Sequence, residues 1–382
     1  MQFGIALPTA ADSWKIVQRA EELGFSHAWF YDTQMLSADC FVAMGAAAVH
    51  TRRIRLGTGV LVPSNRIAPV TANAIATLNQ LAPGRIDFGV GTGFTARRAM
   101  GFGAMKIKDM ETYIAQVYGL LRGEVVEFEM EGQRRKIRFL NPELPLFNTK
   151  DPIKLHLSAF GPRTRALTAK LNAGWIDFVG NVDAGIREVQ AMRAAWSEAG
   201  RAVGDLEATA FALGCVLADG EPADSPRAMA QAGPRAAVML HRAADEAILG
   251  LKPGIAMPTS GRPEVDGYVE LARRFEPKDA PYLQNHRGHL MFVKPEEQRF
   301  ITAELIKATS FTASEREIVE RILKLRDAGY SQFTIQLVPG QEAAIDDWAK
   351  IRKAWASPTP SFRAQRGIQA SPGFLAALGM TG

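Results

Sequence analysis

The sequence predicts an α/β fold, a (β/α)8 barrel of the TIM type, and three observations support this prediction. Strand-like and helix-like segments alternate along almost the whole chain, as parallel α/β folds require. The alternation gives about eight strands, the number that closes such a barrel. Glycines end several strands instead of one fingerprint turn, so a doubly wound sheet is the weaker alternative. At 382 residues, the chain is long enough for one such barrel with insertions.

Each expected element has its own local signal. Short β-rich runs predict strands at 3–7, 27–31, 154–158, 175–179, 207–217 and 332–338, and two more that end at Gly-Thr-Gly. Helical spacing predicts helices at 12–23, 39–49, 69–81, 109–121, 162–171 and 345–355. Asp12 and Asp183 are the expected caps of two helices. The segment Thr312-Ala-Ser-Glu315 is typical of a capping box.

We expect a single barrel domain over 1–356 with two insertions. The segment 124–150 contains a β-hairpin around Glu131-Gly132. The segment 221–295, between strands seven and eight, is expected to form short helices broken by Pro and Gly, and to serve as a lid over the barrel mouth. Residues 357–382 are rich in Pro, Ser and Gly, which predicts a disordered tail.

Composition excludes several function classes. The net charge of +5 is spread along the chain without a block of like charge, which argues against a nucleic-acid partner. No apolar run approaches the length of a membrane span. Cys40 and Cys215 lie in apolar segments and cannot form a disulfide framework, so we expect two buried thiols and a cytoplasmic protein. The expected partners are a small-molecule substrate and further copies of the chain, as a homodimer or higher homo-oligomer.

The most informative motif occurs twice. The chain contains R-I-R-L-G-T-G-V-L-V-P and later G-R-I-D-F-G-V-G-T-G-F, separated by the helix expected at 69–81. Glycines at the carboxyl ends of parallel strands allow a flat ligand to lie against bare backbone, and α/β folds place their sites at these ends. The candidate cofactor-binding residues here are Thr58, Gly59, Val60, Gly91, Thr92 and Gly93.

A second candidate binding segment joins the fifth strand to the next helix. It consists of Ser158, Ala159, Phe160, Gly161, Pro162 and Arg163. Gly161 allows close approach, Pro162 suits a first helical turn, and the free N–H groups of that turn can bind an anion. Arg163 adds a guanidinium fork that can grip phosphate. The alternative is an ordinary helix N-terminus with a solvated arginine.

With these motifs, the segments A-G-W-I-D-F-V-G and N-H-R-G-H-L-M-F-V complete a family pattern. The chain resembles the luciferase-like flavin- and deazaflavin-dependent oxidoreductases, in a branch similar to methylenetetrahydromethanopterin reductase and F420-dependent dehydrogenases. The resemblance covers about 1–355. It implies a non-proline cis peptide at Gly59-Val60 against the central cofactor ring, Gly91-Thr92-Gly93 below the ring, and the cofactor phosphate at 158–163.

The chain also departs from the family pattern. Asp32 is followed by Thr33, where relatives commonly carry a histidine that serves the substrate face. Luciferases carry a reactive cysteine at the position of Gly91, so its absence argues against light emission. Phe94 and Arg97 replace an acid and an amide, which argues against sugar-phosphate oxidation. Arg97 and Arg98 could instead bind an anion or lie on the surface.

The candidate catalytic residues are Asp32 and two histidines of the lid, His286 and His289. Histidine titrates near neutral pH and can shuttle a proton. The alternatives are a helix-capping role for Asp32 and hydrogen-bonded structural roles for the histidines. Two histidines three residues apart could ligate a metal, but N-H-R-G-H-L contains no further ligand at helical spacing, so no metal is expected.

The resulting hypothesis is a monooxygenase that uses reduced FMN and O₂ on a small organic substrate. A separate flavin reductase would be one source of the reduced cofactor. The alternative within the enzyme class is F420-dependent hydride transfer, because both cofactors share a tricyclic ring and differ mainly in the tail. A non-catalytic flavin-binding barrel is the less favoured third hypothesis.

Overall fold

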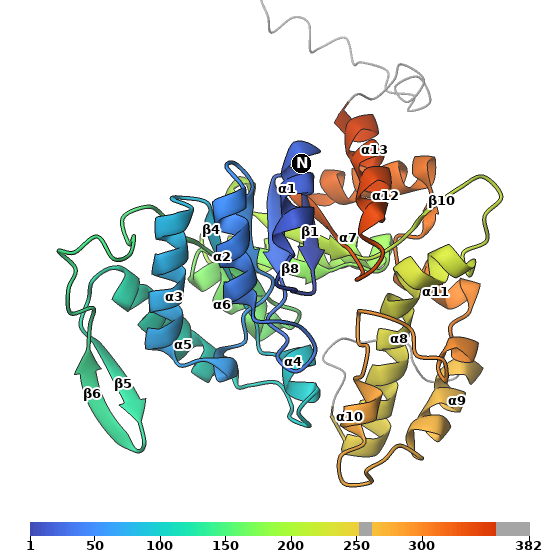
Figure 1. Cartoon of the computed structure of the whole chain (residues 1–382), viewed down its shortest axis with the longest axis horizontal. Coiled ribbons are helices and arrows are strands. Elements are labelled where there is room, and N and C mark those ends of the chain that lie inside the picture. Colours follow the sequence, from blue (N-terminus) through green and yellow to red (C-terminus); the bar gives the residue numbers. More distant parts are fainter. Residues whose placement is uncertain (252–261, 357–382) are drawn as a thin grey trace, which may run out of the picture.

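A closed barrel of parallel strands forms the centre of the computed structural model, which describes residues 1–251 and 262–356 (Figure 1). The strand order is β1-β12-β9-β8-β7-β4-β3-β2, which confirms the predicted TIM barrel. The predicted tail lies outside the described residues. The barrel strands are β1 Gln2–Leu7, β2 His27–Phe30, β3 Arg55–Thr58, β4 Ile86–Val90, β7 Lys154–Ser158, β8 Gly174–Phe178, β9 Ala208–Ala212 and β12 Gln332–Gln336.

Helices surround the barrel and bury its outer face. They are α1 Trp14–Glu22, α2 Cys40–His50, α3 Ala68–Leu81, α5 Ile107–Leu121, α6 Pro162–Lys170, α7 Val182–Glu198, α12 Glu315–Ala328 and α13 Ile345–Ala356. A further short helix, α4 Phe94–Arg98, follows β4 and lies outside this layer. One large hydrophobic core fills the space between these helices and the strands. A smaller cluster, centred on Trp29, Ile176 and Phe211, fills the barrel interior. Strands buried on both faces explain why their sequences are apolar runs without alternation.

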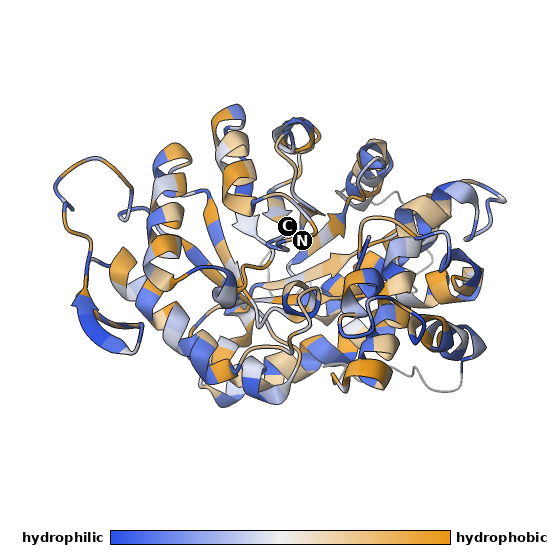
Figure 2. Cartoon of the chain, turned by 60° about the horizontal axis from the view of Figure 1, so that its bottom comes forward, coloured by the Kyte–Doolittle hydropathy of each residue, from blue (hydrophilic) through white to orange (hydrophobic). Residues whose placement is uncertain are grey.

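The predicted hairpin is present as β5 Val126–Met130 and β6 Gln133–Ile137, paired antiparallel. Glu131 and Gly132 form its turn with φ values of 54° and 72°. Positive φ at both central residues matches the right-handed twist of a hairpin. Figures 1 and 2 show the hairpin on the side of the barrel opposite the lid, with mostly hydrophilic residues.

The segment between β9 and β12 forms a separate layer beside the barrel mouth (Figure 1). It contains β10 Val216–Leu217, α8 Pro226–Leu249, α9 Pro263–Ala272, α10 Tyr282–Asn285, α11 Ala303–Thr309 and β11 Ala313–Ser314. We call the residues of α8 to α10 and the turn up to Met291 the lid. A second hydrophobic core holds α8, α9 and α11 together.

The expectation of short, broken lid helices is wrong for α8. This helix runs for 24 residues and continues through Pro234. A proline inside a helix costs about 3 kcal/mol, but 15 of the α8 residues are buried, and their packing outweighs that cost. Tertiary packing therefore overrides the local break signal.

The seventh strand is shorter than expected. β9 ends at Ala212, and Val216–Leu217 pairs instead with β11, outside the barrel. Gly214 lies directly against the carbonyl group of Phe311, so the chain turns away from the barrel here. Only glycine allows so close an approach of two backbones.

Three helix starts differ from the predicted caps. Ser13, not Asp12, precedes α1, and Asp12 forms a surface ion pair with Lys15 at 3.3 Å. Asn181 caps α7 in place of Asp183 by accepting the Ala184 N–H. The capping box of α12 is formed by Ser314 and Glu317, two residues later than predicted. Several polar residues near each helix start could serve as the N-cap, and the backbone conformation at the helix start determines which of them takes that position. Among the helices of the described residues, none combines the length and apolarity needed to cross a membrane.

Candidate functional site

A cavity of about 840 Å³ lies at the carboxyl ends of the barrel strands, where the lid covers part of the mouth. Residues that follow β2, β3, β4, β7 and β8 form its barrel side, and α8 with the turn at 289–291 forms its lid side. This volume falls within the range of small-molecule and cofactor sites, which is roughly 300–1,000 Å³. Ten of the twelve predicted cofactor residues line this cavity: Gly59, Val60, Gly91, Thr92, Gly93, Ser158, Phe160, Gly161, Pro162 and Arg163.

Gly59-Val60 is a non-proline cis peptide, as the family resemblance implies. The backbone around it stays in register, because the Gly59 N–H donates to the Phe30 carbonyl at 2.7 Å and the Leu61 N–H donates to Gly89 at 2.8 Å. A Cβ added to Gly59 would meet Trp29 Cβ at 2.9 Å. The glycine therefore faces the barrel interior, and Val60 faces the cavity.

The second Gly-Thr-Gly motif leaves bare backbone beside Val60. A Cβ on Gly91 would lie 2.7 Å from Val60 Cγ2 and 3.5 Å from Ser158 Cβ, both in cavity-lining residues. Gly93 has φ 79° and its Cβ would overlap Val62. Side chains at either position would fill this wall, so the wall suits a flat ligand that rests on backbone atoms.

Two predicted cofactor residues do not line the cavity. Thr58 is buried, and its hydroxyl donates to the Gly89 carbonyl at 2.7 Å and accepts from the Gly89 N–H at 3.0 Å. Ala159 is buried, and its carbonyl accepts the Trp175 indole N–H at 2.7 Å. Both residues lie behind the cavity wall and support it, because these backbone partners hold them there.

The start of α6 forms one rim of the cavity. Thr164 accepts the Gly161 N–H at 3.2 Å and donates to the Gly161 carbonyl at 2.9 Å, which holds the first turn. Arg163 is exposed on this rim. Lys106 and Lys108, at the start of α5, are also exposed and line the same cavity. Three cations and a helix N-terminus make this rim suitable for an anion.

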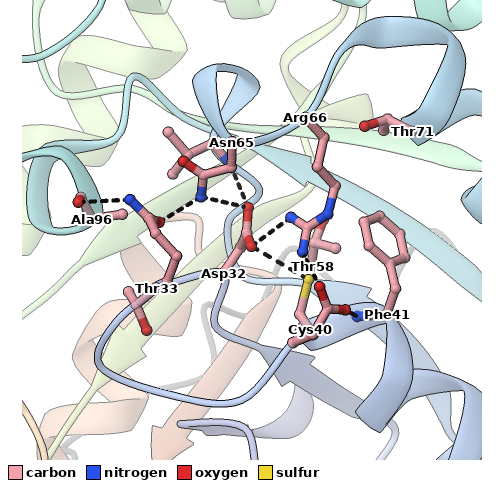
Figure 3. Close-up of polar contacts among 12 residues, drawn as sticks. Asp32, Thr33, Cys40, Phe41, Thr58, Asn65, Arg66, Thr71 and Ala96 are labelled. Carbon is pink, nitrogen blue, oxygen red and sulfur yellow. Dashed lines mark hydrogen bonds and ion pairs between the residues drawn. The ribbon is translucent and has the colours of Figure 1, made fainter.

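Asp32, a predicted catalytic residue, lines the cavity, and its contacts are those expected of a positioning residue (Figure 3). Its carboxylate is 4% exposed. One oxygen accepts from the Val62 N–H at 3.1 Å and from Asn65 at 3.2 Å, and the other accepts from Arg66 at 2.7 Å and from the Cys40 thiol at 3.7 Å. All of these groups donate to the carboxylate, so Asp32 holds the loop after β3 in place and caps no helix among the described residues. Burial and this carboxylate also raise the pKa of the Cys40 thiol.

The two predicted lid histidines occupy different positions. His289 lines the cavity, and its Nε2 lies 3.4 Å from the hydroxyl of Thr95, another lining residue. His286 is buried behind it and is not a lining residue. Leu290, which follows His289, has φ 62°. Its carbonyl accepts a hydrogen bond of 2.7 Å from the side chain of Gln336, the last residue of β12. This hydrogen bond connects the turn of the lid to the barrel.

Sequence reasoning missed two cavity arginines, Arg235 and Arg242, which lie seven residues apart on α8 and therefore on one helix face. Their seven-residue spacing indicates a shared face only if the segment is read as one long helix. Arg242 is buried with its guanidinium 4.6 Å from the centre of the Phe94 ring. Burial and the neighbouring Arg235 and Arg98 lower the pKa of Arg242 to about 9.

Arg97 and Arg98, considered above as anion ligands or surface residues, have structural roles. Arg98 is buried and donates to Asp245 at 2.8 Å, while its guanidinium stacks on Phe94. Arg97 donates to the Gly103 carbonyl at 2.6 Å. Neither lines the cavity. The buried partner Asp245 decides the position of Arg98, and it comes from α8, 147 residues away in the sequence.

Solved structures with the same fold include the coenzyme F420 dependent tetrahydromethanopterin reductase from Methanopyrus kandleri, with a TM-score of 0.64 and 20% identity over 91% of this chain and 97% of that chain. Another is the oxygenating constituent of 3,6-diketocamphane monooxygenase from Pseudomonas putida, with a TM-score of 0.60 and 14% identity over 94% of this chain and 98% of that chain. At these identities the likeness shows the fold alone.

Curated relatives match part of the chain. The 5,10-methylenetetrahydromethanopterin reductase of Methanolobus tindarius is 31% identical over 179 residues, which are 46% of this chain and 53% of that protein. The F420-dependent glucose-6-phosphate dehydrogenase of Beutenbergia cavernae is 35% identical over 140 residues, 35% of this chain and 40% of that protein. The chain thus spans about half the length of these relatives or less. The family described as luciferase-like monooxygenase matches residues 2–332, and the chain belongs to this family.

Proposed function

We propose that the protein is an F420-dependent oxidoreductase that transfers a hydride between the deazaflavin and a small anionic substrate. The observation that carries this proposal is the cavity itself. It joins a bare-backbone wall at Gly59-Val60 and Gly91 to a cationic rim and to a second cationic group on the lid. The curated relatives named above support F420 over FMN, the cofactor first favoured from the sequence.

The wall and the rim fit the two ends of such a cofactor. The wall offers the flat surface that a tricyclic ring needs, because a Cβ on Gly91 would fill it. The rim offers the α6 N-terminus and the exposed cations Arg163, Lys106 and Lys108. FMN ends in one phosphate, whereas F420 continues through a phosphodiester into a tail that carries carboxylates. Several exposed cations in one cavity suit the longer anionic tail.

The lid side supports an anionic substrate. Arg235 and Arg242 line the cavity opposite the barrel wall, and burial lowers the pKa of Arg235. The lowered pKa of Arg242 reflects burial and like charges, a state that an anion in the cavity would relieve. We infer a carboxylate or phosphate group on the substrate.

The bound deazaflavin would supply the hydride chemistry, and the protein would orient the substrate and exclude water. His289 is the cavity imidazole best placed to hydrogen-bond a substrate oxygen, since its Nε2 is on the cavity side beside Thr95. It approaches from the lid, whereas the family histidine would have come from the position of Thr33. Thr33 lines the cavity too, but its hydroxyl is 2.9 Å from Ser37.

The second candidate function is the FMN-dependent monooxygenase inferred from the sequence. One observation favours it: the α6 N-terminus with Arg163 could hold the single phosphate of FMN equally well. Under this alternative the lysines at the start of α5 would have no cofactor group to bind.

Comparative ligand binding tests the proposal. Cofactor-free protein is titrated with F420 and with FMN while ligand fluorescence is followed, and F420 is expected to bind at least tenfold more tightly. The F420 complex is then mixed with alcohols and carbonyl compounds that carry a carboxylate or phosphate, alongside neutral analogues. We expect the anionic compounds to reduce or oxidise the deazaflavin and the neutral analogues to leave it unchanged.

Three outcomes would count against the proposal. Tighter FMN binding with oxygen consumption would establish the monooxygenase instead. Binding without turnover of any substrate would favour the non-catalytic flavin-binding barrel. Equal turnover of neutral and anionic analogues, or unchanged discrimination in Arg235→Gln, would overturn the role of the lid arginines.

A further inference from the structure

Three histidines meet inside the lid, where His289 lines the cavity and His241 and His286 lie behind it. His241 lies on α8, His286 directly follows α10, and His289 lies in the next turn. All three are buried, and they are three of the six histidines in the chain. Each offers a nitrogen within 4.8 Å of the others. The sequence pointed to two of them and lacked a third ligand nearby; the fold brings His241 from 45 residues before His286.

The inner nitrogens of the three rings converge. The Nδ1 atoms of His241 and His289 are 2.9 Å apart, and those of His286 and His289 are 3.4 Å apart. Two nitrogens on one tetrahedral ion, each at ~2.0–2.1 Å, lie roughly 3.3 Å apart. The separations of these two pairs bracket this value, and the ligand atoms of all three histidines lie within 4.8 Å of one another.

The outer nitrogens are held by carboxylates. His241 Nε2 lies 3.0 Å from Glu297, and His286 Nε2 lies 3.1 Å from Asp245. A carboxylate accepts a hydrogen bond, so each outer nitrogen carries the proton of a neutral ring, and each inner Nδ1 presents a lone pair. Carboxylate-bound imidazoles with inward lone pairs are the usual arrangement around a bound metal.

Without an ion, the cluster is incompletely satisfied. A single proton on His289 Nδ1 would have to serve two acceptors, one at 2.9 Å and one at 3.4 Å. An ion at the centre would instead use all three lone pairs. Burial and nearby cations lower the pKa of His241 and His289, and the neutral ring is the form that ligates.

We propose that His241, His286 and His289 bind a divalent transition-metal ion of the zinc type. Three imidazoles without thiolates suit zinc and its neighbours in the transition series. The ion would join α8 to the turn that carries His289. It would also fix the tautomer of His289, because a ring bound through Nδ1 keeps its proton on Nε2, on the side of Thr95 and the cavity.

The surrounding charges predict an ion that a chelator can remove. Asp245 is already paired with Arg98 at 2.8 Å, and Glu297 with Lys294 at 3.1 Å. The two carboxylates therefore do not add net negative charge to the site, and three neutral imidazoles supply the affinity.

Metal content of the protein tests the proposal directly. The protein is purified without a histidine tag, stripped with EDTA, dialysed against Zn²⁺ or Co²⁺, and analysed by mass spectrometry of the metal. We expect about one equivalent of ion per chain, a rise of several degrees in melting temperature on reloading, and visible Co²⁺ bands typical of low-symmetry nitrogen coordination. None of these measurements requires the cofactor, so they can fail or succeed independently of the proposed function.

Variants separate the cluster from adventitious binding. His286→Asn and His289→Asn should each lose the ion and the Zn²⁺-dependent rise in melting temperature. His50→Asn is the control, because this histidine lies at the end of α2 and stacks on Trp14. If a cluster variant fails to fold, the stripping and reloading of the parent protein still decides the question. Stripped parent protein that takes up well under one equivalent, or cluster variants that bind as much as the parent, would overturn the proposal.

Discussion

Replacing Asp32 by asparagine separates a positioning role from proton transfer. The carboxylate is 4% exposed and accepts from Val62, Asn65 and Arg66 within 3.2 Å (Figure 3). An asparagine amide places an N–H group where one oxygen stood, so one of these donors loses its acceptor. A hydrogen bond to a charged group contributes about 1.5–3 kcal/mol, and an unsatisfied buried donor adds about 1–3.

Arg66 limits the damage, since it also pairs with Asp39. We therefore expect Asp32→Asn to lower the free energy of unfolding by about 2–4 kcal/mol, measured by urea denaturation. The loop after β3 carries Val60 and Val62 of the cavity wall, so cofactor affinity should fall as well. The turnover of the residual complex should change much less.

Asp39→Asn is the matched control. Asp39 is the other partner of Arg66, its side chain is 46% exposed, and it caps α2. Asparagine caps helices as well as aspartate does, and an exposed ion pair contributes less than about 1 kcal/mol. Equal losses of stability in the two variants would refute the argument. So would an Asp32→Asn variant of normal stability and cofactor affinity that had lost turnover, because that result would return Asp32 to a catalytic role.

Three further predictions concern the cavity and the barrel. Gly91→Ala should weaken cofactor binding tenfold or more without unfolding the barrel, because its Cβ would meet Val60 at 2.7 Å. Gly204→Ala, at an exposed position outside the cavity where an added Cβ has no neighbour within 4 Å, should bind normally in the same titration, and similar affinities of the two variants would contradict the bare-backbone wall. Arg163→Ala should cost roughly 1 kcal/mol of affinity for a phosphate-bearing cofactor, because the side chain is exposed. Calorimetry should show no loss of affinity for riboflavin or its deaza analogue, which lack the phosphate. A loss for ligands with and without phosphate would indicate a packing effect. Burial lowers the pKa of His27 to about 4, below its unfolded value near 6.5, so the folded state binds fewer protons in this window and stability should fall as pH decreases from about 6.5 toward 4. His27→Gln should remove this contribution, and urea unfolding at pH 7 and pH 5 that changed equally in parent and variant would refute it.

The fold and the barrel wall of the site could be predicted because their signals are contiguous in the sequence. The two Gly-Thr-Gly motifs each end one strand, and parallel strands place all such ends on one face. Likewise, Ser158 to Arg163 form one uninterrupted turn into α6, so local chemistry alone indicated the anion site. The hairpin at Glu131-Gly132 needed only its turn residues.

The lid side required the tertiary structure. Pro234 locally signals a helix break, but burial of α8 in the second core keeps the helix continuous, and this places Arg235 and Arg242 on one face. Local spacing predicts neither the contacts of Asp32 with Val62 and Arg66, which lie 30 and 34 residues away, nor the approach of His241 to His286.

The physical reason lies in the range of the interactions. Periodicity, capping and turn chemistry act over a few residues, so the sequence by itself determined the strand and helix alternation, the glycines of the cavity wall and the start of α6, where an anion site stays a prediction. Hydrophobic packing and buried ion pairs join residues far apart in the chain, and their energies exceed local propensities. Only the folded structure could therefore decide that Asp32 contacts the loop after β3, that Arg98 pairs with Asp245, and that three histidines meet inside the lid.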